Sequence, residues 1–363
     1  MPRKTGRMLP RGRVGGRSSL TLIPALLTAC LSLGLRPGPD PIPCAFNGVD
    51  KIVAVGDLHG DYQNFVKILI GTRLVDKDLH WTGGRAHLVQ VGDVLDRGPS
   101  ARRIFDLLIG LEKEAEAAGG KVHTLLGNHE ELALEGLSFD YPGYVTVEQF
   151  LSFLPDLYID QRQSEYIKKK TAGLPPQDEP VSISLTELMD FWKTVMTERS
   201  AQREYFRSLD ALYGPWLLSH NAVIRINDVI FAHGGISEPY STMSLQSIND
   251  NLRDELGLAM KGVEFRPVTL FASNNPLWYR DLALKDEGVM AADVDRILAN
   301  LKAAHMVVGH SQQGYQTLGT MERFGGKIWV IDTGISNSLG GRYSALVIRN
   351  QDFEPWGVIN GAK

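Results

Sequence analysis

The sequence predicts an α/β fold in which strands alternate with helices, interrupted by one long helical insertion. Short apolar runs rich in Val and Ile recur along residues 51–349, and most of them end in a polar loop that contains glycine. Helical segments follow the first of these loops, which is the pattern of βαβ units. Because sites in α/β proteins form at the carboxyl ends of strands, the polar loops are expected to build one.

The amino-terminal part of this pattern repeats a strand, a polar loop and a helix. The strands are expected because β-branched and other apolar residues run together between turn signals. The helix at 101–118 is closed by a pair of glycines, as helix ends often are. The expected strands are 51–55, 86–91 and 121–126, the helices 62–70 and 101–118, and the polar loops 56–61, 92–99 and 127–130.

The carboxyl-terminal part repeats the arrangement. Strands expected at 228–232, 305–308 and 327–331 lead into loops that hold His233, His310 and Asp332. A last strand is expected at 343–349.

About 100 residues separate Glu130 from His233, which is too many for a plain loop. Helices are expected at 147–157 and 185–213, the second with a capping box that starts at Ser184, and residues 161–180 are expected to form an exposed loop. The insertion is placed at about 138–220. Its aromatic side chains could line a lid over the site or pack the helices together, and packing is expected for at least half of them: Phe139, Tyr141, Tyr144 and Tyr158.

Composition narrows the function. The formal net charge of −4 and the lack of a basic stripe after residue 50 argue against a nucleic-acid partner. Only two cysteines are present, Cys30 and Cys44, so neither a disulfide framework nor cysteine-rich zinc ligation is expected. Any metal must therefore bind to Asp, His and Asn side chains.

The amino-terminal segment, residues 1–49, is expected to be a targeting signal and linker before a domain at 50–363. Residues 1–39 contain no Asp or Glu, and a basic start is followed by a short apolar run, as in a secretory signal. Residues 27–30 resemble a bacterial lipobox, which would put a lipid anchor on Cys30 and the protein in the periplasm or cell envelope. An organelle transit peptide and a disordered tail are the alternatives.

The residue types after the strands suit a pair of divalent metal ions. Carboxylate oxygens and imidazole nitrogens bind Mn²⁺, Fe and Zn²⁺, which are the ions expected here. Two neighbouring metals can hold a phosphate, acidify a bridging water and stabilise the leaving oxygen. A single Asp-x-His would indicate little, but the whole ordered set is not expected by coincidence.

The set resembles the signature of the calcineurin-like metallophosphoesterases. Its complete Asp-Arg-Gly and Asn-His-Glu forms look like the phosphoprotein phosphatase branch, and residues 276–280 and 308–311 look most like the Shewanella-like protein phosphatases. Those two segments are also similar to symmetrical diadenosine tetraphosphatases, while the Ser-Ala-Pro-Asn-Tyr motif of eukaryotic Ser/Thr phosphatases is not visible. The motifs are Gly-Asp-x-His-Gly at 56–60, Gly-Asp-x-x-Asp-Arg-Gly at 92–98, Gly-Asn-His-Glu at 127–130, His-Gly-Gly at 233–235 and Gly-His at 309–310.

The resemblance implies a double β-sheet sandwich of the metallophosphoesterase type and a role for each motif residue. His129 would be the general acid, Asp96 would orient it, and Arg97 would bind phosphate, with Arg280 as a candidate second phosphate ligand. Asp332 is expected either to support the ligands or to be a turn residue, and His123, His220 and His305 are expected to be structural. The implied metal ligands are Asp57 and His59 for the first ion, Asp93 for both, and Asn128, His233 and His310 for the second.

The resemblance therefore implies a metal-dependent phosphatase that acts on phosphoprotein or another phosphomonoester, with a preference for phosphotyrosine. A symmetrical dinucleoside polyphosphate hydrolase is the alternative enzyme. A non-catalytic phosphopeptide-binding module is the alternative from another class, although such a module would tolerate the loss of ligands that are all present here.

Overall fold

The computed structural model describes residues 42–140, 143–172, 182–264, 266–312 and 321–357. The chain divides into a unit that ends at Asp40 and a compact unit from Pro41 to Lys363, which holds every element below. The predicted export signal with Cys30 lies outside the described residues, and so does Tyr141. Within the described part of the chain, no helix combines the length and apolar character needed to cross a membrane.

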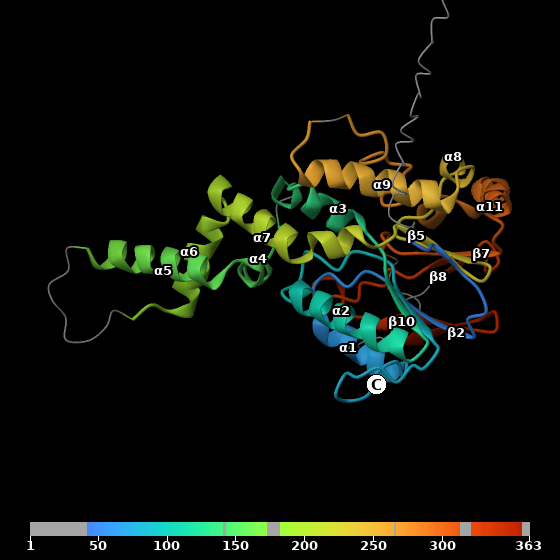
Figure 1. The fold of residues 1–363 in the computed structure, drawn as a ribbon, viewed down its shortest axis with the longest axis horizontal. Helices are drawn as coiled ribbons and strands as arrows, with labels where there is room; N and C mark the ends of the chain where they lie inside the picture. The colour runs from blue at the N-terminus through green and yellow to red at the C-terminus, as the bar shows by residue number, and fades with distance from the viewer. Residues whose placement is uncertain (1–41, 141–142, 173–181, 265, 313–320, 358–363) are drawn as a thin grey trace, which may run out of the picture. The chain divides into compact units, whose positions relative to one another are not determined.

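Two mixed β-sheets form the centre of the compact unit (Figure 1). A 6-stranded sheet has the order β1-β5-β6-β7-β9-β8, and a 5-stranded sheet has the order β11-β10-β2-β3-β4. The parallel neighbours are β2, β3 and β4 in the 5-stranded sheet, and β6, β7 and β9 together with the pair β1 and β5 in the 6-stranded sheet. The strands are β1 Ala45–Phe46, β2 Lys51–Val55, β3 His87–Gln90, β4 Lys121–Thr124, β5 Val223–Ile226, β6 Val229–Ala232, β7 His305–Val308, β8 Met321–Arg323, β9 Ile328–Val330, β10 Ser344–Arg349 and β11 Asp352–Gly357.

Alternating side chains explain why the sheets pack face to face. Ile52 and Ala54 of β2 belong to the core between the sheets, whereas Val53 and Val55 face the helices on the outer side. The same alternation in β6 puts Phe231 in the inner core. A strand whose two faces are both apolar must be covered on both sides, so the sandwich with outer helices follows from the sequence pattern. The predicted fold class is confirmed.

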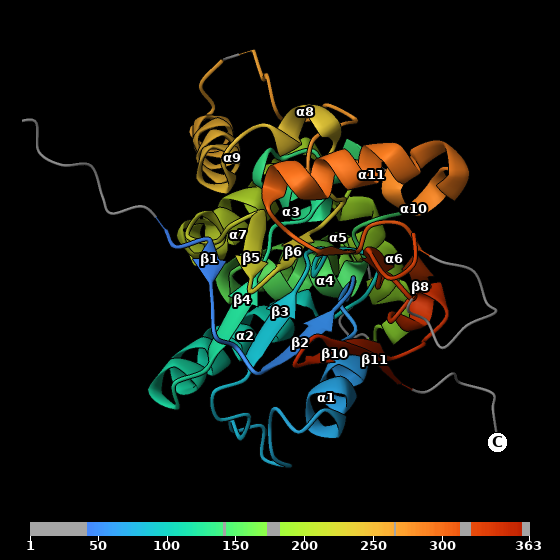
Figure 2. The same ribbon diagram turned by 90° about the vertical axis from the view of Figure 1, so that its right-hand side faces the viewer.

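Helices cover both outer faces of the sandwich (Figure 2). α1 and α2 lie against the 5-stranded sheet, and Asp61 caps α1 by accepting a hydrogen bond from the Asn64 backbone N–H at 2.9 Å. The helices of the body are α1 Tyr62–Gly71, α2 Ala101–Ala117, α3 Asn128–Leu134, α8 Glu238–Ser241, α9 Leu245–Met260, α10 Asp281–Leu284 and α11 Glu287–Leu301, with the 3₁₀ turn η2 Asn337–Leu339.

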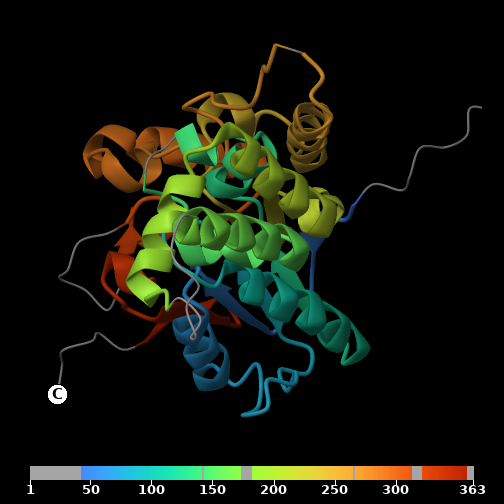
Figure 3. The ribbon, with the colours of Figure 1, turned by 90° about the vertical axis from the view of Figure 1, so that its left-hand side faces the viewer.

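The insertion consists of helices that project from one side of the sheets (Figures 1 and 3). Its elements are the 3₁₀ turn η1 Ser138–Asp140 and the helices α4 Val147–Phe153, α5 Asp156–Thr171, α6 Leu185–Val195 and α7 Arg199–Leu218. α4 packs against α2 of the body and against α7. The insertion is joined to the body through α4 and also through α7, which packs against α3 and α9.

Three details of the predicted insertion were wrong. The helix expected at 147–157 breaks at Leu154, which is extended before Pro155, a conformation that proline imposes on its predecessor. The loop expected from residue 161 is helical up to Thr171. α5 is rich in polar residues and none of its residues is fully buried, so its sequence lacks the apolar face by which a helix is predicted. The helix expected at 185–213 is two helices, α6 and α7.

Candidate active site

The predicted metal ligands come together where the carboxyl ends of the parallel strands of both sheets meet. The loop after β2 carries Asp57 and His59, and the loop after β3 carries Asp93. α3 begins at Asn128 after β4, and the ends of β6 and β7 supply the two remaining histidines. One cavity of about 200 Å³ is lined by most of the predicted site residues, namely Asp57, His59, Asp93, Arg97, Asn128, His129, Arg280 and His310. His233 and Asp96 lie behind this lining and contact it.

The loops hold an unfavourable backbone conformation at several of these residues. Positive φ angles occur at His59 (41°), Asp93 (58°), Asp96 (70°), Arg97 (64°) and His310 (63°). A side chain with a Cβ adopts this region at a cost, and such residues cluster at functional sites. The strain indicates that the surrounding contacts select these conformations for their side-chain directions.

Glu130, to which the sequence assigned no role, supplies much of that support. Its buried carboxylate accepts hydrogen bonds from the backbone N–H groups of Asp93 (2.8 Å), Val94 (2.9 Å), Leu95 (3.1 Å) and Gly127 (2.9 Å). The loop after β3 is therefore fixed to the start of α3. The only available signal was the glutamate of the Gly-Asn-His-Glu motif itself.

Two glycines let backbone lie directly against the carboxylates. A Cβ on Gly309 would be 2.3 Å from Asp57 Oδ1, and one on Gly127 would be 2.3 Å from Asp93 Oδ1. No side chain fits at such distances. In place of a side chain, the His310 N–H donates to both Asp57 carboxylate oxygens at 3.1 Å.

One group of atoms has the character of a cation site. His233 Nδ1 lies 3.0 Å from the Val91 carbonyl, so in the neutral ring Nδ1 donates and Nε2 carries the lone pair. Although burial opposes it, the charge of Asp93 raises the pKa of His233, so Asp93 favours a positive charge at this ring. That Nε2 lies 2.9 Å from Asn128 Oδ1, 3.1 Å from His310 Nδ1 and 3.3 Å from Asp93 Oδ1. The amide and carboxylate oxygens are acceptors, and a neutral imidazole offers a lone pair as well. A divalent cation would satisfy the whole group at once.

A second group shares Asp93. His59 Nδ1 contacts the Leu95 carbonyl at 2.9 Å, so Nε2 faces Asp93 Oδ2 at 3.7 Å. Two sets of side chains are close enough together to hold a metal ion. One set is His59, Asp93 and His129, and the other is Asp93, His233 and His310. Asp57 lies near Asp332: burial, and then the charge of Asp332, raises the pKa of Asp57. Asp93 thus belongs to both groups, as a bridging ligand must.

The electrostatics of His59 and His310 also fit metal binding. Burial lowers the pKa of His59 to about 3 and that of His310 to about 2, so both rings are neutral at physiological pH. His310 Nε2 is buried and has no hydrogen-bond partner. Neutral imidazoles with a free lone pair are the form that binds a metal ion. The residues present therefore fit a pair of divalent ions.

The acid side of the cavity is built around His129. Its Nδ1 lies 2.7 Å from Asp96 Oδ2, so Nε2 faces the cavity, 3.8 Å from Asp93 Oδ2. Although burial opposes it, Asp93 and Asp96 raise the pKa of His129. The Tyr144 ring lies 4.8 Å from the His129 ring, centroid to centroid. His129 is thus held in one orientation and able to carry a proton toward the cavity.

Two arginines lie at the cavity, and the buried Nε of Arg97 has no hydrogen-bond partner. The Arg97 backbone N–H donates to the Tyr144 carbonyl at 2.6 Å, and its guanidinium lies 4.7 Å from the Tyr144 ring centroid. Arg280 Nη1 donates to the His310 carbonyl at 2.7 Å. Both arginines line the same cavity as the metal groups, which brings positive charge to one place. This arrangement can bind an anion next to the ions.

The wall around Arg280 contains two residues that the sequence did not single out. Trp278 lines the cavity, and its indole N–H donates to the buried Glu131 at 2.7 Å. Burial, followed by the charge of Glu135, raises the pKa of Glu131 to about 8. Glu131 Oε1 also accepts the Phe271 N–H at 3.1 Å, so it ties the loop that carries Trp278 to α3. Asp332 lines the cavity as well, and chiefly burial raises its pKa to about 6.

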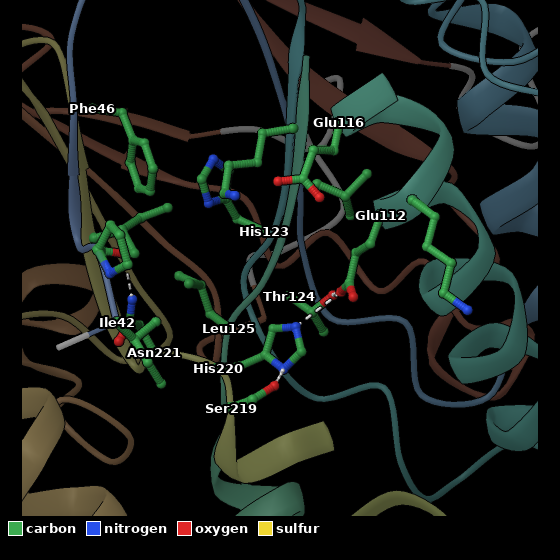
Figure 4. A pocket seen from close by; sticks show the side chains of 15 residues that line it. Ile42, Phe46, Glu112, Glu116, His123, Thr124, Leu125, Ser219, His220 and Asn221 are labelled. Atoms are coloured by element: carbon green, nitrogen blue, oxygen red, sulfur yellow. Dashed lines mark hydrogen bonds and ion pairs between the residues drawn. The ribbon is translucent and has the colours of Figure 1, made fainter. Parts of the chain in front are cut away.

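The remaining histidines lie away from this cavity. His220 is paired with Glu112 at 2.8 Å and His123 with His87 at 3.0 Å, and His305 Nδ1 lies 2.7 Å from the Gly326 carbonyl. His123 and His220 line a second cavity of about 290 Å³, bordered by β4 and α2, which shares no residue with the first (Figure 4).

The aromatic residues of the insertion divide between the two expected roles. Phe139 packs among Phe150, Tyr205 and Phe206 with ring centroids 5.4–6.0 Å apart, so it joins helices and does not line the catalytic cavity. Tyr158 also packs against the core. Tyr144 does line the cavity. Packing was expected for at least half of the four aromatics, and Phe139 and Tyr158 do pack, whereas Tyr144 lines the cavity.

Comparisons with known proteins agree with this geometry. The family profile of the calcineurin-like phosphoesterases matches residues 50–314. Shewanella-like protein phosphatase 2 of Arabidopsis thaliana is 29% identical over 277 residues, which cover 74% of this chain and 68% of the relative. Shewanella-like protein phosphatase 1 of Plasmodium berghei is 25% identical over 79% of this chain and 67% of its own.

Among solved structures, the cold-active protein-tyrosine phosphatase of a psychrophilic Shewanella species is similar. Its TM-score is 0.62 with 25% sequence identity, and the match covers 87% of this chain and 82% of that one.

Proposed function

The chain belongs to the calcineurin-like phosphoesterases, and on that premise we propose that this phosphatase is a phosphoprotein phosphatase that depends on two divalent metal ions. The observation that carries the proposal is one cavity where two groups of metal-binding side chains share Asp93 and lie beside Arg97 and Arg280. His129 belongs to the first group by position, and its Nε2 faces the cavity as a proton donor. Hydrolysis of a phosphate monoester needs three functions in one place: metal ions, a proton donor for the leaving oxygen, and groups that bind the phosphate.

Two ions would be held by the six predicted ligands, with Asp93 shared. The ions supply Lewis acidity and an activated water when bound. The ligand set contains only oxygen and nitrogen, which favours Mn²⁺, Fe or Zn²⁺.

The side chains of this protein would bind the phosphate and donate the proton. Arg97 and Arg280 bind and orient the phosphate through paired N–H donors. His129 gives the proton at Nε2 to the leaving oxygen, and Asp96 keeps the opposite proton on Nδ1. Glu130 keeps the loop after β3 in place through its backbone hydrogen bonds.

For the substrate, we infer a preference for phosphotyrosine. Tyr144 and Trp278 put aromatic surface on the cavity beside His129 and Arg280, and a phosphotyrosine ring can stack there. The similar Shewanella structure is described as a tyrosine phosphatase, which supports the same inference. A phosphotyrosine also holds its phosphate farther from the peptide backbone than phosphoserine does.

The test is a substrate panel on the metal-loaded protein. We expect a higher kcat/KM on phosphotyrosine peptides than on phosphoserine or phosphothreonine peptides or diadenosine tetraphosphate. Tyr144→Ala should reduce that preference more than it reduces hydrolysis of small aryl phosphates, whereas Tyr166→Ala, outside the cavity, should not. Dinucleotides as the best substrate would favour the dinucleoside polyphosphate hydrolase, and phosphopeptide binding without phosphate release would favour the binding module.

We further propose that the protein is exported and carries lipid on Cys30. The basic and apolar start of the sequence supports this proposal. Mass spectrometry of the native mature amino terminus decides it: a chain that begins at Cys30 with added acyl mass is expected, and an intact Met1 in a cytosolic fraction would exclude export.

A further inference from the structure

One buried side chain of the insertion reaches the residues that hold the general acid. Gln149 lies in the first turn of α4, where its backbone N–H donates to Thr146 Oγ1 at 3.1 Å. Its side chain is completely buried, as are those of Asp96 and Tyr205. A buried amide is unfavourable unless all its polar atoms are paired, so its partners show what keeps it there.

The Gln149 amide pairs with Asp96 on two sides. Its Oε1 accepts the Asp96 backbone N–H at 2.8 Å, and its Nε2 donates to Asp96 Oδ1 at 2.8 Å. The second amide hydrogen goes to the Tyr205 hydroxyl at 2.9 Å. Turning the amide over would place oxygen against the Asp96 carboxylate and NH₂ against the Asp96 N–H. Only the observed orientation satisfies both atoms.

This pairing has a consequence for His129. Asp96 Oδ1 is taken by Gln149, so the other oxygen, Oδ2, meets His129 Nδ1 at 2.7 Å. The carboxylate cannot rotate without breaking the bond to Gln149, and Asp96 has the positive φ of 70° that directs its N–H at the same amide. A carboxylate fixed in this way fixes the tautomer and the ring plane of the histidine that it holds.

We propose that Gln149 is a positioning residue for the phosphatase reaction, because it fixes Asp96 so that His129 presents its Nε2 proton to the leaving oxygen. The inference rests on the proposed role of His129. It also assigns the insertion a part in catalysis: α4 and α7 act together, through Gln149 and Tyr205, on a residue pair that belongs to the α/β body.

The main test compares leaving groups. Gln149→Met keeps length and volume but removes every hydrogen bond to Asp96. We expect kcat on an alkyl phosphate to fall by about 10- to 100-fold, as when a residue that supports a catalytic side chain is removed. The loss on p-nitrophenyl phosphate should be smaller, because that leaving group needs little protonation. Bound metal and KM should change little.

The second test asks whether Gln149 acts through His129. In a His129→Ala background, Gln149→Met should cause no further loss, since residues that act as one unit are not additive. A loss of the same size in both backgrounds, or an equal loss on both leaving groups, would overturn the inference. If Gln149 only stabilised the fold, Gln149→Met would also reduce the activity that remains in the His129→Ala protein.

Two further variants keep the test decisive. Tyr205→Phe removes only the hydroxyl that receives the second Gln149 hydrogen, so a smaller effect with the same leaving-group dependence is expected even if Gln149→Met does not fold. Gln202→Met serves as the matched control, because Gln202 lies in α7 and donates to the Met196 carbonyl without touching Asp96. Wild-type protein that releases no phosphate from any ester would refute the proposed function instead of this inference.

Discussion

The α/β body and the helical insertion contribute to the same cavity in different ways. The body supplies every predicted metal ligand, each from a loop that directly follows a strand or from the start of α3. The insertion supplies Tyr144 at the wall and Gln149 behind Asp96. The body thus presents the metal ligands, whereas the insertion, through Gln149 and Asp96, orients the ring of the proposed general acid His129. Changes in the body should therefore affect metal binding, and changes at the junction should affect proton transfer or phosphate binding.

The largest effect is expected in the body, at the shared ligand. Asp93→Asn removes a charge from both metal groups, so both ions should bind more weakly and turnover should fall by about 10³-fold or more. Metal analysis and phosphate release measure the two effects. Full activity with normal metal content would show that Asp93 is not a shared ligand.

His129 lies where the body meets the insertion: its partner Asp96 is held by Gln149 of α4. In His129→Ala, turnover should fall by about 10²- to 10⁴-fold with nearly intact metal content, because the general acid is lost and the ligands remain. The loss should be smaller on p-nitrophenyl phosphate than on an alkyl phosphate. Equal losses on the two substrates would mean that His129 has another role.

A moderate effect is expected at the phosphate ligands. Arg97→Ala should lower kcat/KM by roughly 10- to 100-fold, as for the loss of charged hydrogen bonds. Arg97→Lys keeps the charge but not the paired donors, so it should recover only part of the loss. Arg199→Ala in the insertion, outside the cavity, is the control and should have no effect. Complete recovery by lysine would contradict paired binding.

The smallest effect concerns stability near the end of α3, where body and insertion pack together. Burial, and then the charge of Glu255, raises the pKa of Glu135 from 4.5 to about 7. A raised carboxyl pKa means that the folded state binds the proton more tightly. The contribution of Glu135 to the free energy of unfolding is therefore fully present below about pH 4.5 and is lost as the pH rises through about 7.

Glu135→Gln should remove this loss. We expect its melting temperature to match the wild type near pH 4.5 and to exceed it by roughly 1–2 °C at pH 8. The exposed Glu116→Gln is the control, for which thermal unfolding should show no such trend between the two pH values. A Glu135→Gln protein that is less stable than the wild type at pH 8 would show that the carboxylate makes a favourable contact there.

The two regions also differ in how far the sequence predicts them. The ligands in the body sit next to glycines in short motifs after β-branched strands, so local pattern located the polar loops, and the family resemblance of those motifs implied Asp57, Asp93 and His233 as ligands. The role of Gln149 depends on α4 packing against α2, a contact between residues far apart in the chain. β1 and β5 were missed for a similar reason, because β1 has only two residues and is defined by its pairing with β5. Local pattern predicts ligands, but tertiary contacts decide which side chains support them.

If this chain hydrolyses phosphate esters with two metal ions bound in one cavity, phosphate release must depend on both ions. The most direct measurement is phosphate release from an aryl phosphate by chelator-treated protein while Mn²⁺, Fe²⁺ or Zn²⁺ is added back and bound ions are counted. We predict that activity disappears with the metal and returns as about two ions bind per chain, the number that a two-metal site holds. Full hydrolysis by the metal-free protein, or full recovery with a single ion, would contradict the account.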